Sequence, residues 1–220
     1  MKTKTTFPRP ARSAALTLWE VLIVVFVIVG LVVVILPSIK RNRRHHGPEM
    51  NCINNLKQVG LSFRLWAQDN GDRFPMQTSV MNGGTMELVP NAAAFPHFAV
   101  MSNDLVTPKL LICRSDYDRV LATNFSSLSD TNLSYFVNLS ASPAFPGAWI
   151  AGDRLMLNAT NRLGGIVKLH TNDPVRWLES IHAHAGGIAL ADGSASMLSS
   201  SKLAASLHSQ TNSPFQLVFP

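Results

Sequence analysis

The longest apolar stretch of the chain lies near its N-terminus. Every residue of Val21–Leu36 is apolar or glycine, and a shorter mixed turn precedes it. As a helix, the 21 residues of Leu16–Leu36 would be about 30 Å long, which matches the hydrocarbon core of a bilayer. Valine and isoleucine favour strands in water, but in lipid a helix is favoured because it satisfies its own backbone groups. The pattern predicts a single membrane-spanning helix over residues 16–39.

Two other kinds of N-terminal segment also carry such a block. A cleaved secretory signal ends in small residues at its cleavage site, and Leu36-Pro37-Ser38-Ile39-Lys40 offers no such pattern. A plain signal anchor stays open, because four basic residues precede the block and four follow it, so that charge does not decide the orientation. Glu20 is unusual for a plain anchor, since an acid near the end of a membrane helix is costly. It either lies at the interface and reaches water or has a specific task.

A second apolar pattern, with the period of a helix, follows a basic segment. Lys40–His46 suits a collar at the membrane surface, and Gly47-Pro48 is expected to interrupt the helix, although a proline also suits the start of a new one. From Asn51 to Ala67 apolar residues recur at steps of three and four, which predicts an amphipathic helix packed on a core. Turn-forming residues at 69–72 predict its end. The predicted apolar stripe consists of Ile53, Leu56, Val59, Gly60, Phe63, Trp66 and Ala67.

The clearest strand patterns lie in the C-terminal part of the chain. Gly164–His170 predicts one strand, and Gly187–Leu198 predicts two that flank Asp192-Gly193. This dipeptide is typical of a two-residue hairpin turn, because both turn positions need positive φ. We expect a short helix over Ser201–His208, capped by its first residue, and an edge strand at Phe215–Phe219.

The middle of the chain, residues 74–148, is rich in proline, asparagine, serine and alanine. This composition predicts short elements and long loops. Leu105–Cys113 is expected to lead into a strand, and the alternation at Leu133–Leu139 predicts another.

The distribution of charge argues against a nucleic-acid-binding protein. The chain carries a net charge of +6, but residues 1–48 hold eight basic side chains and one acidic one, a net charge of +7. The remaining residues hold 11 basic and 12 acidic side chains, a net charge of −1. The globular part therefore has no basic stripe for phosphates. The basic residues flank the apolar block, where they can meet anionic lipid headgroups.

The two cysteines, Cys52 and Cys113, are too few for a zinc ribbon. Outside the cytoplasm they could form one disulfide, which would close a loop of about 60 residues and contribute roughly 4 kcal/mol in the chain-entropy model. The alternative is two separate buried thiols that behave as small apolar side chains. The residues themselves leave both possibilities open.

The pattern that comes closest to a catalytic or metal-binding site consists of His182, His184 and Asp192. The two histidines alternate along the chain and could face one way, with Asp192 orienting one ring. No third clear ligand or nucleophile accompanies them. The interpretation we favour is that Asp192 accepts backbone hydrogen bonds in its turn while His182 packs nearby. We therefore expect neither enzymatic activity nor a resident metal.

The N-terminal segment resembles the processing site of type IV prepilins and type II secretion pseudopilins. A basic leader is followed by Ala15 and then by Leu16-Thr17-Leu18-Trp19-Glu20 and the apolar helix. The resemblance implies that a prepilin peptidase cuts between Ala15 and Leu16 and methylates the new N-terminus. It also implies that Glu20 pairs with the N-terminal amine of a neighbouring subunit during assembly. Ala15 and Leu16 depart from the glycine and phenylalanine that the family prefers, and Pro37 stands where the family carries a helix-kinking proline.

Three later segments resemble a large branch of the same family. They are the helix segment Asn51–Leu61, the run Cys113-Arg114-Ser115-Asp116, and a His-x9-Asp-Gly element formed by His182, Asp192 and Gly193. The first two favour a disulfide between Cys52 and Cys113. Some pseudopilins bind calcium through C-terminal carboxylates, and Asp153, Asp173 and Asp192 are the candidates here, although no dense calcium loop is present. No other cofactor is expected.

The resemblance implies an α+β fold in which a long N-terminal helix, half in the membrane and half amphipathic, packs on a small antiparallel sheet with long loops. The expected organisation is a leader at 1–15, a transmembrane helix at 16–39, a basic linker at 40–50 and a globular domain at 51–220. The implied protein is a single-pass protein of the bacterial inner membrane with its C-terminal domain in the periplasm. Its implied partners are the prepilin peptidase and other pseudopilins, with which it assembles into a filament.

Two other functions stay open at this stage. The first is a membrane-tethered binding module that captures a polymer or surface ligand with the middle of the chain. The second, with the least support, is a tethered hydrolase that uses His182 and Asp192.

Overall fold

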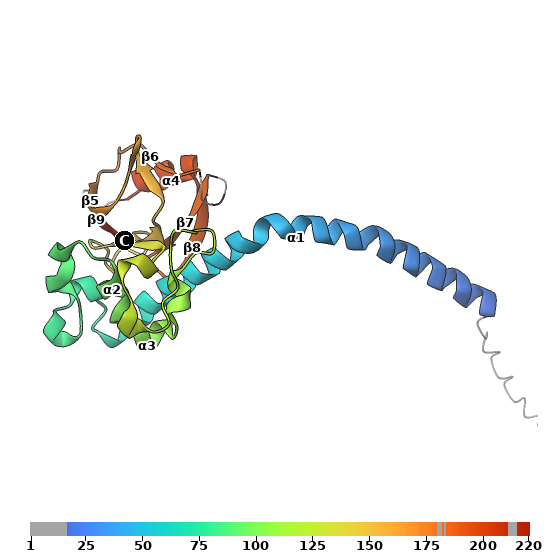
Figure 1. The fold of residues 1–220 in the computed structure, drawn as a ribbon, viewed down its shortest axis with the longest axis horizontal. Coiled ribbons are helices and arrows are strands. Elements are labelled where there is room, and N and C mark those ends of the chain that lie inside the picture. The colour runs from blue at the N-terminus through green and yellow to red at the C-terminus, as the bar shows by residue number, and fades with distance from the viewer. Residues whose placement is uncertain (1–16, 180–181, 183, 211–214) are drawn as a thin grey trace, which may run out of the picture. The chain divides into compact units, whose positions relative to one another are not determined.

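The computed structural model describes residues 17–179, 182, 184–210 and 215–220, and over 34–49 it describes only the backbone. The chain forms two compact units, residues 1–46 and residues 47–220. It has the mixed helix and antiparallel sheet content of the α+β class (Figure 1). Among the described residues, no helix combines the length and the apolar character that crossing a membrane requires.

Helix α1 runs from Leu18 to Asp69 and contributes to both units. The interruption expected at Gly47-Pro48 is not present, because α1 continues through this dipeptide. A proline inside a helix removes one backbone hydrogen bond and costs about 3 kcal/mol, which weakens a helix without ending it. The predicted end of the helix is confirmed: the N–H of Asp72 donates to the carbonyl of Ala67 at 2.8 Å, and Gly71 adopts a φ of +68°.

The second half of α1 packs as its periodicity predicts. Leu56, Val59, Phe63 and Ala67 are fully buried, and Trp66 is nearly so. Asn54, Lys57 and Gln68 lie outside this face and are exposed, whereas Ser62 is buried with the apolar residues. The amphipathic helix predicted at 51–67 is therefore confirmed, and its apolar side forms one wall of the main core.

A six-stranded antiparallel sheet has the strand order β5-β9-β1-β2-β7-β8. The sequence patterns at 133–139, 164–170 and 187–198 predict four of these strands, whereas nothing in the sequence analysis marks β2. The strands are β1 (Tyr135–Asn138), β2 (Trp149–Asp153), β5 (Gly165–Leu169), β7 (Ala185–Leu190), β8 (Ala195–Ser199) and β9 (Phe215–Phe219).

A second sheet has three short strands in the order β4-β3-β6. They are β3 (Met156–Asn158), β4 (Asn161–Arg162) and β6 (Val175–Trp177), none of which the sequence analysis predicts.

Strand β9 corrects a prediction about position. Its bounds agree with the expected strand at Phe215–Phe219, but it lies between β5 and β1 and is not an edge strand. Four of its five side chains are buried, because both of its edges are paired and the sheet is covered on both faces.

Helix α4 (Ser200–His208) begins two residues earlier than a cap at Ser201 implies, because Ser199 and not Ser201 caps it. The hydroxyl of Ser199 accepts from the N–H of Lys202 at 3.4 Å.

The middle of the chain consists of short helical turns and loops, as its composition predicts. The strand expected near Leu105–Cys113 is absent from these described residues, and a short 3-10 helix, η4, occupies part of the segment. Pro75 and Pro108 are the first residues of two of these turns, a position that suits proline. The elements are η1 (Pro75–Gln77), η2 (Val80–Asn82), η3 (Met86–Asn91), α2 (Phe95–Ala99), α3 (Ser102–Leu105), η4 (Pro108–Leu111), η5 (Phe125–Ser127) and η6 (Asp130–Asn132).

The six-stranded sheet separates two clusters of buried side chains. Tyr135 and Val137 of β1 join the cluster that contains α1, whereas Phe136 between them joins the cluster that contains α4. This alternation is the period of two that a strand imposes on its side chains. The sheet is therefore covered on one face by α1 and on the other by α4.

Candidate functional site

The first turn of α1 contains a reciprocal hydrogen-bond pair. The Glu20 carboxylate accepts from the backbone N–H of Thr17 at 2.8 Å and from its hydroxyl at 2.9 Å. In return, the N–H of Glu20 donates to the Thr17 hydroxyl at 3.4 Å. This arrangement is a capping box, and it starts the helix at Leu18. Ala15 and Leu16, between which cleavage is predicted, lie outside the described residues.

In its described apolar part, α1 is not divided into an apolar and a polar face. Every large apolar side chain from Leu18 to Val33 is between 46% and 82% exposed. A helix that is apolar on all sides is normally covered, either by lipid or by other protein. The described part of this chain leaves it uncovered.

A disulfide joins Cys52 of α1 to Cys113, which follows η4, with 5.0 Å between the two Cα atoms. The two residues are 61 positions apart, and both are buried. The disulfide ties the start of the buried half of α1 to the loop-rich middle of the chain.

His182 packs against this disulfide. Its Nε2 lies 3.2 Å from Cys113 Sγ, and its Nδ1 lies 3.3 Å from the hydroxyl oxygen of Ser115. Cys52, Cys113 and His182 are the one group of three potential metal-ligand residues found close together in the described ranges. Because a metal is bound by the thiolate form of cysteine, and both sulfurs are joined in a disulfide, this arrangement suits a histidine packed on a disulfide. His182 holds a φ of +41°, an uncommon conformation for a residue with a side chain.

Asp192 and Gly193 form the turn between β7 and β8. The Asp192 carboxylate accepts from the N–H of Ser194 at 2.8 Å, which agrees with the expectation that it accepts backbone hydrogen bonds in its turn. The turn has three residues and not two: the N–H of Gly193 donates to the carbonyl of Leu190 at 3.0 Å, and only Gly193 has positive φ. This is the type I turn followed by a glycine that serves three-residue hairpins.

The three aspartates considered for calcium do not converge in the described structure. Asp173 accepts from the backbone N–H of His170 at 2.9 Å, Asp192 is exposed in its turn, and Asp153 is buried. One Asp153 oxygen accepts from the N–H of Gly187 at 2.6 Å, and the other has no partner among the described residues. Burial raises the pKa of Asp153 to about 7.

A buried ion pair that the sequence analysis missed lies near the same strand end. Arg154 donates to both carboxylate oxygens of Asp116 at 2.7 Å and also to the exposed carboxylate of Asp118 at 3.3 Å. Asp116 appears in the sequence only as part of the run after Cys113. Nothing in its spacing points to Arg154, 38 positions away.

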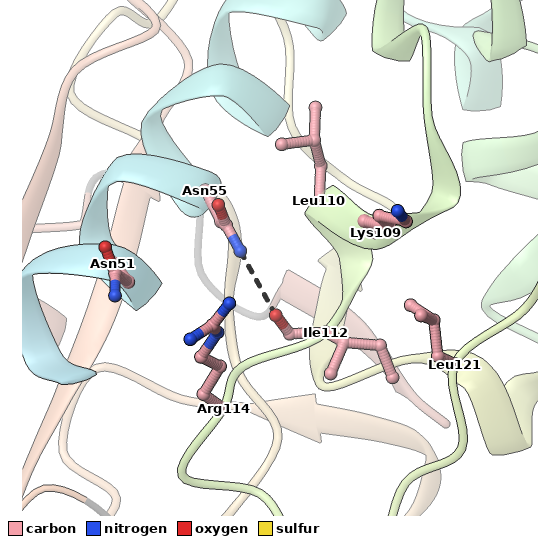
Figure 2. Close-up of a pocket in the computed structure, with 7 residues that line it drawn as sticks. All are labelled: Asn51, Asn55, Lys109, Leu110, Ile112, Arg114 and Leu121. Carbon is pink, nitrogen blue, oxygen red and sulfur yellow. Dashed lines mark hydrogen bonds between the residues drawn. The ribbon is translucent and has the colours of Figure 1, made fainter.

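A surface cavity of about 370 Å³ lies between α1 and the segment 109–121, which begins within η4 (Figure 2). Asn51 and Asn55 line it from α1, and Lys109 and Arg114 line it from the opposite segment. Figure 2 shows Arg114 extending toward α1 beside the hydrogen bond from Asn55 to the carbonyl of Ile112, which is 3.2 Å long. The sequence does not reveal this cavity, because its walls are more than 50 residues apart in the chain.

Comparison of the chain with protein-family models, with curated protein sequences and with solved structures gives no match.

Proposed function

We propose that this protein is a prepilin-like structural subunit that assembles through its N-terminal helix into a periplasmic filament. The observation that carries the proposal is the exposure of every large apolar side chain from Leu18 to Val33. Burying such a surface contributes about 25 cal/mol for each Å² removed from water. Lipid would cover this helix before assembly, and the helices of other subunits would cover it within a filament.

The start of the helix supports a role in subunit docking. In the proposed pathway a prepilin peptidase removes residues 1–15 and leaves Leu16 with a free or methylated amine. Thr17, the next residue, donates its N–H to Glu20. This contact holds an exposed carboxylate close to the helix start, where the positive amine of a neighbouring subunit can reach it. Pairing of the two charges would offset the cost of an acid in an apolar environment.

The proposed setting is the bacterial inner membrane. A single transmembrane helix at 16–39 would be followed by the basic segment at 40–50 and by a globular domain in the periplasm. The disulfide between Cys52 and Cys113 is consistent with an oxidising compartment. The proposed partners are the prepilin peptidase and other pseudopilins of a type II secretion or type IV pilus-like system. The role is structural, without catalysis.

Mass spectrometry of the protein from cells with an active prepilin peptidase tests the processing step. The expected N-terminus is Leu16, with or without one added methyl group, and cells without the peptidase should retain Met1. Ala15→Gly should be processed at least as completely as the wild type, because it restores the residue that the family prefers. An intact leader in cells with the peptidase would contradict the proposal.

A second candidate function is a membrane-tethered binding module that uses the N-terminal signal only for sorting. The cavity lined by Lys109 and Arg114 favours it, since a binding module requires a ligand site. The two functions differ in self-association: the subunit forms contacts between apolar helices, whereas the tethered module stays monomeric in the membrane.

A further inference from the structure

The cavity between α1 and the segment 109–121 has an uncompensated positive charge. Lys109 and Arg114 are exposed, and neither forms an ion pair with any residue that the structure describes. No acidic side chain belongs to the described lining. Arg154 shows the contrast, because two carboxylates bind it. The two cations of the cavity are therefore free to meet an anion from outside the chain.

Neutral hydrogen-bonding groups accompany these cations. Asn51 and Asn55 present their side-chain amides from successive turns of α1. The Asn55 amide nitrogen already donates to the carbonyl of Ile112, and this bond fixes the orientation of its side chain. The amide nitrogen has a second hydrogen and the Asn51 amide has two, so that donors remain for an anionic oxygen.

The two walls of the cavity are held together covalently. Cys52 lies between Asn51 and Asn55 on α1, and Cys113 lies between Ile112 and Arg114 on the other wall. The disulfide between them, together with the Asn55 hydrogen bond, fixes the separation of the two walls. A site built in this way loses little conformational freedom when a ligand binds, and this favours affinity.

The remaining lining is aliphatic. Leu110 and Ile112 are partly buried, and Leu121 is 48% exposed. A volume of about 370 Å³ is at the small end of ligand sites in proteins. The described lining has no aromatic ring, of the kind on which a sugar would stack. A planar carboxylate matches the fork of a single arginine, and an aliphatic group would cover the exposed leucine and isoleucine side chains.

We propose that this cavity binds an aliphatic carboxylate, such as a peptide C-terminus with an apolar last side chain or a free small acid of the same chemistry. The carboxylate lies against Arg114 and the asparagine amides, with Lys109 adding positive charge. The aliphatic part lies on Leu110 and Ile112. The site uses only the part of α1 that belongs to the globular unit, residues 47–220, and none of the exposed apolar part, so its failure would leave the filament proposal intact.

The test uses the full chain in a mild detergent at low salt, with N-acetyl-leucine as the probe and ligand-observed saturation-transfer NMR as the measurement. N-acetyl-leucinamide has the same aliphatic group without the charge, and inorganic phosphate has charge without the aliphatic group. A longer peptide that ends in leucine and a free branched-chain carboxylic acid separate the two sources of the ligand. We expect saturable binding of N-acetyl-leucine and at least tenfold weaker binding of its amide and of phosphate.

Arg114→Gln should weaken N-acetyl-leucine at least tenfold, because it removes the charged fork and leaves the disulfide in place. Arg73→Gln is the matched control, since Arg73 is exposed, carries the same charge and does not line the cavity. It should bind like the wild type. Unsaturable binding, equal binding of the amide, equal competition by phosphate, or the same affinity in the Arg114→Gln variant would each overturn the proposal.

Discussion

Gly60 of α1 and Gly193 of the β7–β8 turn lie in direct backbone contact. A Cβ atom at Gly60 would lie 3.3 Å from both Cα and O of Gly193, which is tighter than ordinary contact. Gly193 is also constrained by its φ of +87°. The glycine of the Asp192-Gly193 turn therefore has two requirements, a left-handed conformation and room for the helix. This gives the C-terminal His-x9-Asp-Gly element a packing role. Gly193 packs against α1, and His182 packs against the disulfide that joins α1 to Cys113.

Replacing Gly60 by valine should destabilise the globular domain by about 2 kcal/mol or more, because the new side chain forces the turn away from α1. The measurement is urea unfolding of the full chain in mild detergent, followed by tryptophan fluorescence. Asn54→Val is the control, since Asn54 is exposed on the same helix and the substitution introduces the same β-branched residue. The control should change the free energy of unfolding by about 0.5 kcal/mol or less. Equal effects of the two substitutions would rule out the close contact.

The ion pair between Arg154 and Asp116 offers a matched comparison between a buried and an exposed partner. Asp116 is 4% exposed, whereas the side chain of Asp118 is 72% exposed, and both accept from the same guanidinium. Asp116→Asn should cost about 3–5 kcal/mol of stability, because it leaves a buried charge without its counter-charge. Asp118→Asn should cost less than about 1 kcal/mol. Similar losses for both variants would show that burial does not control the strength of this pair.

Asp153 should make the domain less stable as the pH rises. Burial raises its pKa in the folded protein to about 7, from its ordinary value of 3.8. Between these two values the folded state holds a proton that the unfolded state releases, so the free energy of unfolding falls from about pH 4 to about pH 7 and is then constant.

Asp153→Asn should remove this dependence, because asparagine can still accept from Gly187 without carrying a charge. The variant should resemble the wild type near pH 4 and exceed its stability by a few kcal/mol at pH 8. Unfolding of both proteins across this range, compared at each pH, cancels the contributions of all other groups. A constant difference between the two would contradict the raised pKa.

The elements that the sequence predicts well are those whose signal is local. The stripe from Leu56 to Ala67 repeats with the period of a helix, and its burial follows from that period. The strand at Phe215–Phe219 is visible as an apolar run, but its central place in the sheet depends on β1 and β5, which are distant in the chain. The turn at Asp192-Gly193 was predicted one residue too short, because the dipeptide alone does not reveal which residues pair on either side.

The candidate sites also differ in how far apart in the sequence their residues lie, and this decides which of them the sequence predicts. The capping role of Glu20 lies within one helical turn and follows from the pattern Thr-x-x-Glu. The family resemblance indicates a different role for this residue, in assembly. The contact of His182 with Cys113 and the cavity beside Arg114 join segments that are dozens of residues apart. Their spacing in the sequence carries no information about these contacts, which depend on the tertiary structure.

In the proposed filament, the exposed apolar helix associates with the same helix of other subunits. Photo-crosslinking in cells tests it most directly, with benzoyl-phenylalanine in place of Phe26, whose side chain is 79% exposed. The comparison is with Glu20→Gln in the same background, because glutamine keeps the capping box and removes only the charge. In cells with an active prepilin peptidase, we expect a ladder of crosslinked multimers that Glu20→Gln strongly reduces. A single uncrosslinked band from processed wild-type protein, in the presence of its assembly system, would contradict it.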